Sequence, residues 1–349
     1  MPLHRVLKPI IRRLLFLLAG MLLCWSHSYA QKNTLPTEKR IREVMQQAYN
    51  QFKSSSGGAN ASYIPYLANV DPELYGIAIC TADGKVLELG DTKYEFGIES
   101  ISKVFVLALA MQQRGAKAVE DSIGVNATGM PFNSVMAVEL DPQRAVNPLV
   151  NAGAMATHSF IRAPNSAAKW TMIDDMMAKF ASRRLSVIQQ LYASETATNL
   201  HNRAIAWLLY SYGRFYDDVS ESVDLYTRAC SYGSSARDLA IMAGTLANNG
   251  VNPVSREKVI DAVLCPRILA TMITEGLYDN TGSWVYHTGL PAKSGVGGGI
   301  IAVAPGRMAI AVFAPPLDKS GNSVKAQKTL QYIIDELKLN LLMPQVPQG

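Results

Sequence analysis

The sequence predicts an α+β fold in which one antiparallel sheet combines strands from both ends of the chain, with a helical region inserted between them. Three observations support this prediction: a β-rich segment at 74–91 with a strong turn signal, a second β-rich segment at 289–316, and helical stretches between the two. The expected domains are residues 31–112 together with 232–349 for the sheet domain, and residues 113–231 for the helical domain.

Residues 1–30 have the pattern of a secretory signal peptide. Four basic residues precede an apolar run from Leu14 to Trp25, and small residues occupy positions 28 and 30, just before the expected cleavage site. A membrane anchor is the alternative, but this run is shorter than the roughly 20 residues that span a bilayer. We therefore expect cleavage after Ala30, a periplasmic or secreted protein, and no stable membrane association of the cleaved chain.

Removal of this segment almost cancels the net charge. The whole chain carries a formal charge of +5, and residues 1–30 hold four basic residues and no acid, so about +1 remains. The rest of the chain has no block of Lys and Arg with interleaved aromatic residues. The sequence therefore predicts no nucleic-acid partner.

Cysteine and histidine are too sparse to predict a disulfide framework or a metal site. Beyond residue 30 the cysteines are odd in number and widely spaced, so buried free thiols are expected: Cys80, Cys230 and Cys265. The histidines there are isolated and form no HExxH motif: His158, His201 and His287. We expect no metal and no cofactor, and a Ser-His-Asp hydrolase is disfavoured.

The first predicted element is an amphipathic helix over 37–53, with Pro36-Thr37 at its start. Segment 74–91 predicts a β-hairpin, because β-rich runs flank Asp83-Gly84. A buried helix should follow Lys103.

Further helices are predicted at 167–183, 186–213, 218–230, 234–250 and 255–264, with Gly250 as a C-cap. The sheet returns as two strands around Ala304-Pro305-Gly306, and a helix over 323–342 closes the fold.

The segment EFGIESISKVFVLALA, residues 95–110, places two serines and a lysine at the start of the buried helix. Ser100 and Lys103 are one helical turn apart, so they can form a nucleophile and its base. The same spacing occurs in Ser166-Ala-Ala-Lys169 and Ser255-Arg-Glu-Lys258, but only Lys103 leads into a long apolar run. Burial lowers the pKa of a lysine towards the range in which it accepts a proton. The alternative is structural: a serine N-cap and a solvated lysine in the first turn.

Lys293-Ser294-Gly295 has the form of the Lys-Thr/Ser-Gly element that accompanies Ser-x-x-Lys in penicillin-recognising serine enzymes. The glycines from Gly295 to Gly299 allow a substrate to approach the strand backbone, whose N–H groups can stabilise an oxyanion. Taken alone, this segment could also be a flexible strand edge.

Seven blocks in order resemble the serine-dependent glutaminases, which share the β-lactamase-like fold. The blocks lie between about residues 37 and 340: SISKVF, NPLVNAGAM, ETATNLHNRAIAWLL, DLYTRACS, LANNGVNP, GLYDNTG and PAKSGVGGGI. The resemblance implies a β-lactamase/transpeptidase-like architecture, and hydrolysis of L-glutamine to L-glutamate and ammonia through a γ-glutamyl-serine ester. It also implies a homodimer or homotetramer. The leader is a departure, since many members of this family look cytoplasmic.

The resemblance also implies roles for individual residues. Ser100 would be the nucleophile, Lys103 its proton acceptor, and Tyr278 would assist proton transfer. The backbone N–H groups of Ser100 and Val296 would form the oxyanion hole. The remaining residues of the glutamine pocket would be Asn151, Glu195, Asn202 and Tyr226. Glu195 would accept the substrate's ammonium. Taken singly, these side chains could instead be helix caps, half-buried aromatics or a solvated acid.

Two other functions compete with this one. A penicillin-recognising serine enzyme, either a β-lactamase or a peptidoglycan peptidase, would suit export, but the matching blocks offer no Ser-Asp-Asn element. A catalytically silent amino-acid sensor would bind glutamine without turnover.

Overall fold

The computed structural model describes residues 35–144 and 146–343. The predicted signal peptide, residues 1–30, lies outside the described residues, and from Thr37 onward the chain clusters into one compact unit. Among the described residues, no helix combines the length and the apolar character needed to cross a membrane.

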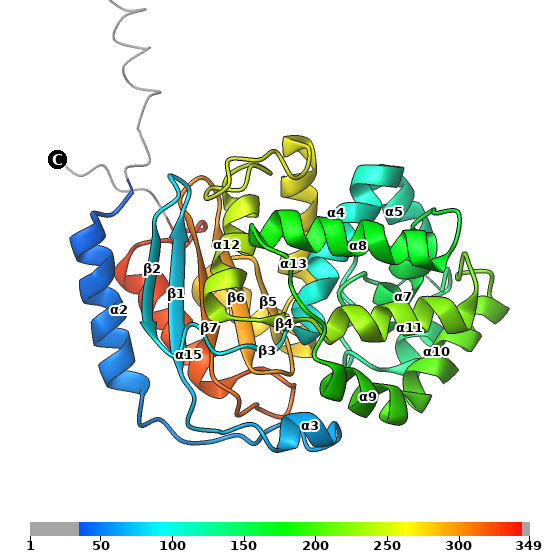
Figure 1. The fold of residues 1–349 in the computed structure, drawn as a ribbon, viewed down its shortest axis with the longest axis horizontal. Helices are drawn as coiled ribbons and strands as arrows, with labels where there is room; N and C mark the ends of the chain where they lie inside the picture. The colour runs from blue at the N-terminus through cyan, green and yellow to red at the C-terminus, as the bar shows by residue number, and fades with distance from the viewer. Residues whose placement is uncertain (1–34, 145, 344–349) are drawn as a thin grey trace, which may run out of the picture. The chain divides into compact units, whose positions relative to one another are not determined.

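A five-stranded antiparallel sheet has the strand order β2-β1-β7-β6-β5 (Figure 1). Its strands are β1 (Gly76–Thr81), β2 (Val86–Gly90), β5 (Ala292–Ser294), β6 (Gly299–Ala304) and β7 (Met308–Phe313). The two ends of the sequence meet in the middle of the sheet, where Ile79 of β1 lies opposite Ile310 of β7. The prediction of one antiparallel sheet built from both ends is confirmed.

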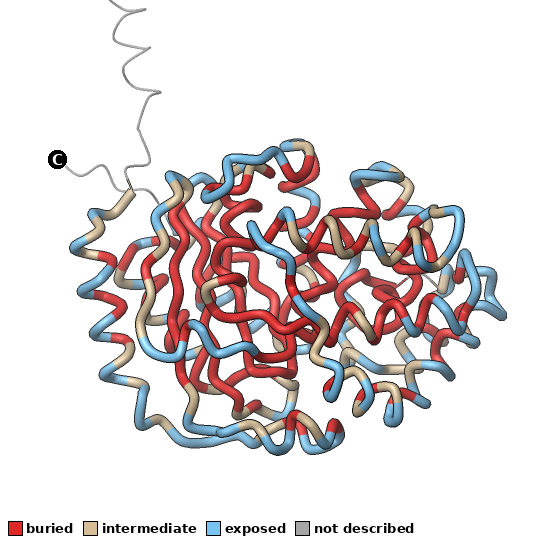
Figure 2. The backbone as a smooth tube through the Cα atoms, in the orientation of Figure 1, coloured by how far each residue is buried: buried red, intermediate tan, exposed pale blue. Residues whose placement is uncertain are grey.

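Helices cover both faces of this sheet. On one face, α12 (Ala236–Ala247) packs against β1, β6 and β7. The terminal helices α2 (Glu38–Phe52) and α15 (Val324–Glu336) pack against each other and against the sheet from the other side (Figure 1). The three central strands are buried throughout, as Figure 2 shows, because side chains alternate between two covered faces. Gly244 brings α12 close to the sheet, since a Cβ there would lie 3.1 Å from Cys80 Sγ.

Between the two halves of the sheet, residues 113–231 are largely helical. The helices are α5 (Ala116–Ser122), α6 (Val135–Leu140), α7 (Asn151–Phe160), α8 (Ser166–Ala181), α9 (Gln189–Thr198), α10 (Leu200–Ser211) and α11 (Val219–Cys230). The helix predicted over 186–213 is divided at Asn199 into α9 and α10. The division into a sheet domain and a helical domain stays a prediction.

The helix predicted over 255–264 is wrong. Asn252 Oδ1 accepts hydrogen bonds from the backbone N–H groups of Val254 (2.9 Å) and Ser255 (3.1 Å), which closes a turn instead. An isolated bridge then pairs Val251 with Lys258. Helix resumes only at η2 (Ala262–Leu264) and α13 (Cys265–Glu275).

The predicted C-cap of the preceding helix, Gly250, lies two residues beyond the observed cap residue. The cap residue of α12 is Asn248, and Gly250 follows with φ +84°.

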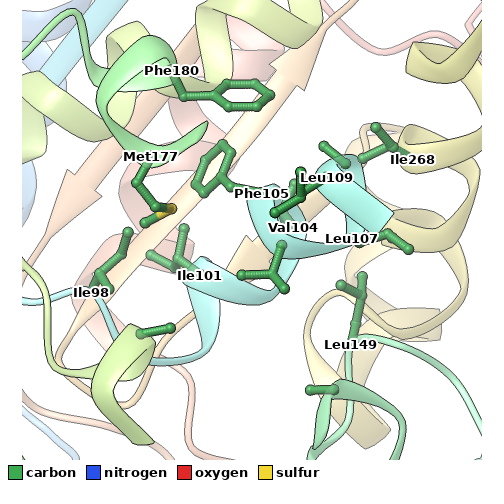
Figure 3. Packing of buried hydrophobic residues seen from close by; sticks show 14 of the residues in the cluster. Ile98, Ile101, Val104, Phe105, Leu107, Leu109, Leu149, Met177, Phe180 and Ile268 are labelled. Carbon is green, nitrogen blue, oxygen red and sulfur yellow. The ribbon is translucent and has the colours of Figure 1, made fainter. Parts of the chain in front are cut away.

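The helix α4 (Ser102–Arg114) lies at the centre of the largest apolar core. Every residue from Ser102 to Met111 is buried, and the helix packs against α7, α8 and α13. Figure 3 shows Phe105 against Phe180 of α8, with ring centroids 4.8 Å apart. The predicted buried helix is confirmed. All three cysteines of the described chain are buried and free, as expected: Cys80, Cys230 and Cys265.

The shorter elements frame the entry to α4. A two-stranded sheet pairs Phe96 with Ser234 immediately before the 3-10 turn η1. These elements are β3 (Phe96–Gly97), η1 (Glu99–Ile101) and β4 (Gly233–Ser234). The others are α3 (Pro65–Ala68), η3 (Tyr278–Asn280) and α14 (Thr281–Thr288).

Candidate active site

Ser100 lies on η1, one turn before α4, and not on the helix itself. The chain reaches this turn through Glu99, whose φ of +51° is uncommon for a residue other than glycine. Ser102 secures the turn, because its hydroxyl donates a 2.6 Å hydrogen bond to the backbone carbonyl of Glu99. The predicted proximity holds: Lys103 Nζ lies 2.5 Å from Ser100 Oγ.

Lys103 is 1% exposed and has no carboxylate within ion-pair distance among the described residues. Besides Ser100, it donates a 2.9 Å hydrogen bond to Asn151 Oδ1. Burial lowers the pKa of Lys103 to about 8, although nearby acidic groups, including Glu99 and Glu195, act in the opposite direction. A substantial fraction of this amine is therefore neutral near pH 8, as a general base requires.

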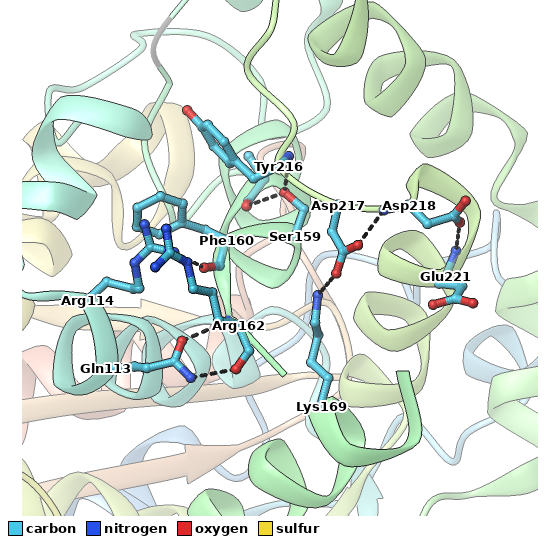
Figure 4. Close-up of polar contacts among 11 residues, drawn as sticks. Gln113, Arg114, Ser159, Phe160, Arg162, Lys169, Tyr216, Asp217, Asp218 and Glu221 are labelled. Carbon is cyan, nitrogen blue, oxygen red and sulfur yellow. Dashed lines mark hydrogen bonds and ion pairs between the residues drawn. The ribbon is translucent and has the colours of Figure 1, made fainter. Parts of the chain in front are cut away.

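The other two Ser-x-x-Lys segments are built differently. Lys169 on α8 is 2% exposed, so it is as buried as Lys103, which its polar sequence context did not indicate. Its amine forms an ion pair with Asp217 (Figure 4). Lys258 is 67% exposed and forms a surface pair with Asp261, 2.6 Å away. Of the lysines in these three segments, only Lys103 is both buried and without a carboxylate partner among the described residues.

Asn151, Asn202 and Tyr226 form a polar network around the Lys103 amine. Asn151 begins α7, and its side-chain oxygen accepts hydrogen bonds from Lys103 (2.9 Å) and from the Tyr226 hydroxyl (3.1 Å). Its amide nitrogen donates to Asn202 Oδ1 on α10 at 3.0 Å. Three helices, α7, α10 and α11, thus hold one network, in which Asn151 also orients the Lys103 amine.

Tyr278 lies beside the serine, and Lys293 packs against the Tyr278 ring. Tyr278 has a φ of +57° and is buried; its hydroxyl donates to the Ser294 carbonyl (3.2 Å). Burial raises its pKa, whereas a hydrogen bond with Ser100 lowers it. Lys293 of β5 lies 4.0 Å from the Tyr278 ring centroid and donates to the carbonyls of Gly276 (2.9 Å) and Ser294 (2.7 Å).

Val296 lies in the tight turn that joins β5 to β6. This turn packs directly on η1: a Cβ at Gly295 would lie 2.8 Å from the Ile98 carbonyl oxygen and 3.3 Å from Glu99 Cβ. Within the described residues, the backbone N–H groups of Ser100 and Val296 donate to no protein acceptor. Glycine at 295 therefore permits the close approach, and both N–H groups are free to bind an oxyanion.

Glu195 of α9 is buried below this network. Ser231 Oγ donates to its Oε1 at 3.3 Å. Burial raises the pKa of Glu195 to about 7, while hydrogen bonds from Ser231 and Glu99 and the charge of Lys103 act to lower it. An acid in such a pocket has a strong preference for a cationic partner.

The sequence interpretation missed two residues that belong to this site. Glu99 is 3% exposed and lies beside Glu195. Tyr63, between α2 and α3, is 55% exposed overall. Burial of its phenol raises its pKa, and the neighbouring Tyr278, Glu99 and Glu195 raise it further. No sequence signal indicated Tyr63. Glu99 directly precedes the serine, and that position could have drawn attention to it.

One cluster in the described chain has donor atoms close enough together to hold a cation. Oxygens of Glu99 and Glu195 and the sulfur of Cys230 all lie within 4.8 Å of one another. Burial raises the pKa of Cys230 far above neutral, so its sulfur is a thiol and not the thiolate that binds metals. The cluster is better described as an acidic pocket facing Lys103.

The structure thus brings together all of the predicted site residues: Ser100, Lys103, Asn151, Glu195, Asn202, Tyr226, Tyr278 and Val296. A buried serine touching a neutralisable lysine, beside free backbone donors, is suited to acyl transfer through a covalent ester.

Comparisons with known proteins agree with one another. The family model described as Glutaminase matches residues 58–342. The glutaminase of Colwellia psychrerythraea is 52% identical over 306 residues, which cover 88% of this chain and 98% of that protein. The glutaminase of Bacteroides thetaiotaomicron is 50% identical over 306 residues, covering 87% of this chain and 95% of that protein.

Solved structures give the same result. The probable glutaminase ybaS superimposes with a TM-score of 0.87 at 48% identity, covering 88% of this chain and 100% of that one. Mglu in its L-glutamate binding form, in the presence of 4.3 M NaCl, gives a TM-score of 0.83 at 33% identity. That match covers 89% of this chain and 71% of Mglu. All residues of the site lie within residues 58–342, which the family model matches.

Proposed function

Because this chain belongs to the glutaminase family, we propose that its buried Ser100–Lys103 pair performs the hydrolysis of L-glutamine to L-glutamate and ammonia. The glutaminase prediction is confirmed at the level of activity, and the rival penicillin-recognising enzyme is set aside. The roles of individual residues are our proposal. The observation that carries it is the 2.5 Å contact between Lys103 Nζ and Ser100 Oγ, made by a buried amine without a carboxylate partner.

In this proposal the substrate binds between an acid, Glu195, and the nucleophile, Ser100. Glu195 accepts the α-ammonium, because it is the acid that ionises near neutral pH in a buried site. Asn151, Asn202 and Tyr226 supply hydrogen-bond partners for the rest of the amino-acid head group. The side-chain amide then reaches the turn that carries Ser100.

In the acylation step, Ser100 Oγ attacks the carbonyl carbon of the side-chain amide and its proton passes to neutral Lys103. The negative charge that develops on the carbonyl oxygen is stabilised by the N–H groups of Ser100 and Val296. Collapse of this intermediate breaks the C–N bond. The leaving nitrogen takes a proton from Lys103, aided by Tyr278, and departs as ammonia.

Deacylation repeats these transfers with water. Lys103 accepts a proton from the attacking water, and the γ-glutamyl ester on Ser100 is cleaved to L-glutamate. The proton returns to Ser100 Oγ, so the free enzyme is restored. Lys293 does not exchange protons in this scheme; it positions Tyr278 and the Ser294 carbonyl through its buried contacts.

The test is ammonia release by the purified protein from L-glutamine, D-glutamine and L-asparagine. We expect turnover of L-glutamine that is lost in Ser100→Ala with an unchanged melting temperature. A Ser100→Ala protein that releases ammonia at the original rate would contradict the assignment. Binding of L-glutamine without any turnover by the unaltered protein would point to a sensor instead.

We also propose that residues 1–30 direct export and are removed after Ala30. The basic start, short apolar run and small residues before the cut support this proposal. Expression in a Gram-negative host, followed by sequencing of the mature N-terminus, should give Gln31 in the soluble periplasmic fraction. Full-length chain in the membrane fraction would support an anchor instead.

The finer fold and assembly predictions also stay proposals. We propose a β-lactamase/transpeptidase-like architecture, supported by the helix-covered antiparallel sheet and by Ser-x-x-Lys at the start of α4. We further propose a homodimer or homotetramer. Large apolar side chains are exposed along α10, and one copy leaves them in water: Leu200, Trp207 and Tyr210. Light scattering after gel filtration measures the oligomeric state directly.

A further inference from the structure

Glu99 directly precedes the nucleophile, and the mechanism above gives it no role. It is buried, and its positive φ is a conformation that costs about 1–3 kcal/mol for a non-glycine residue. Three glycines make room for its side chain. A Cβ at Gly97 would lie 3.2 Å from Glu99 Oε1, and one at Gly295 or Gly297 would lie 3.3 Å from Glu99 Cβ or Cγ. Close packing thus holds this acid in place despite the strained backbone.

The surroundings of Glu99 contain one other acid. Oxygens of Glu99 and Glu195 approach within 4.8 Å, and Glu99 Oε1 receives no hydrogen bond from any donor in the described residues. The other titratable groups around the pair are Lys103 on α4, Tyr226 and Cys230 on α11, Tyr278 on η3, and Tyr63. Lys103 is the cation that acts on both acids.

Two carboxyl groups this close in a buried site do not both ionise. Burial, followed by the charge of Glu195, raises the pKa of Glu99 well above its ordinary value. Burial raises the pKa of Glu195 only to about 7, because hydrogen bonds from Ser231 and then from Glu99, together with the charge of Lys103, stabilise its anion. Glu195 is therefore the member of the pair that ionises near neutral pH, and Glu99 is the member that keeps its proton.

We propose that Glu99 is a protonated positioning residue of the ammonium site, which donates a hydrogen bond to the Glu195 carboxylate and holds it towards the substrate. The pocket then presents one negative charge to one α-ammonium. This inference rests on three observations: Glu99 Oε1 receives no hydrogen bond, three glycines make room for the Glu99 side chain, and the two acids lie close together. It rests on the proposed role of Glu195 and assigns Glu99 no part in bond making or breaking.

The experiment compares Glu99→Met with Glu99→Gln in the full protein, by steady-state ammonia release between pH 6 and 9. Methionine matches the length of glutamate but donates nothing, so KM for L-glutamine should rise about tenfold, as for loss of a hydrogen bond to a charged group. The change in kcat should stay below about threefold. The acid limb of kcat/KM should move to higher pH, because the Glu195 anion loses its donor.

The side chain introduced by Glu99→Gln keeps a hydrogen-bond donor at the same place. This variant should therefore bring KM for L-glutamine back to within about threefold and restore the original acid limb of kcat/KM. Glu95→Gln, four residues earlier on the surface, is the matched control and should change neither quantity. If Glu99 works as an anion, Glu99→Gln will weaken binding as much as Glu195→Gln does, and the proposal is overturned. An unchanged KM and pH profile in Glu99→Met would overturn it as well.

Both outcomes are distinguishable from failure of the proposed function, in which the unaltered protein releases no ammonia from L-glutamine. If Glu99→Met does not fold, Glu99→Gln alone decides between a proton donor and an anion.

Discussion

Lys103 and Lys169 occupy the same sequence pattern, Ser-x-x-Lys, and the same degree of burial, yet the protein uses them for different purposes. Lys169 makes an ion pair with Asp217, a half-exposed acid on the loop before α11. Lys103 faces a serine hydroxyl and an amide oxygen instead. A buried amine that is ion-paired with a carboxylate is held in its charged form, whereas one that is hydrogen-bonded only to neutral groups can lose its proton. The proposed base role of Lys103 therefore depends on its partners as well as on its burial.

The serines of the two segments should show the largest difference. Ser100→Ala should lower kcat by several orders of magnitude, because no other hydroxyl touches Lys103 in the described structure. Ser166→Ala, at the start of α8, should leave kcat unchanged. Ammonia release and thermal melting of both proteins check this. Ser102→Ala is a second control, since its hydroxyl bonds to the Glu99 carbonyl and not to Lys103. Equal losses in Ser100→Ala and Ser102→Ala, with native-like melting, would undo the nucleophile assignment.

The lysines should differ almost as much. Lys103→Arg keeps the charge but cannot release its proton at accessible pH, so it should be nearly as inactive as Ser100→Ala. Lys169→Arg can still pair with Asp217 and should keep most of the activity. Steady-state kinetics of the two variants, with circular dichroism to verify folding, make the comparison. Substantial turnover by Lys103→Arg would leave Lys103 as an electrostatic partner and make Tyr278 the leading base.

Removing the acid at the other end of the pocket should have the next largest effect. Loss of one partner from a buried charge pair costs roughly 3–5 kcal/mol, so Glu195→Gln should lower kcat/KM for L-glutamine by about 10² to 10³·⁵. An N-acetylated glutamine has no ammonium, so its rate should fall less and the preference for glutamine should narrow. Measuring both substrates in both proteins gives the ratio. An unchanged ratio would place the ammonium at another acid.

The smallest effect concerns the paired lysine. Asp217→Asn leaves the Lys169 charge buried without its counter-charge. Asp217 is about half exposed, so the loss should fall between that of a surface pair and that of a buried one, about 1–2 kcal/mol in the free energy of unfolding. Urea denaturation measures this, and kcat should not change. A loss of kcat without a loss of stability would show that the two lysines are coupled.

The sequence predicted the helices and strands and their order better than it predicted which side chains contact each other. The turn signals at Asp83-Gly84 and Ala304-Pro305-Gly306, together with the apolar run after Lys103, were sufficient to place four strands and the buried helix. The side-chain hydrogen bonds of Asn252, which replace a helix over 255–264, have no signature in periodicity.

In the candidate active site, too, the sequence predicted local contacts but not those that depend on the tertiary fold. Local spacing predicted the Ser100–Lys103 contact, and the resemblance to a family supplied the residues from α7 to α11 that surround it. The burial of Lys169 and its pairing with Asp217, 48 residues away, depend on tertiary packing that no local pattern records. Glu99 was missed for a related reason: its role depends on its contact with Glu195, which the fold creates.

The central claim is that Lys103 acts as a neutral amine, and it is tested most directly by changing the basicity of that amine alone. Lys103→Cys, alkylated with 2-bromoethylamine, restores the amine on a chain in which sulfur replaces one methylene and makes the nitrogen less basic. The account predicts that alkylation restores turnover and that the rise of kcat with pH, expected near pH 8 in the unaltered protein, moves to lower pH. Restored activity whose kcat rises at the unaltered pH would contradict the claim that Lys103 is the base.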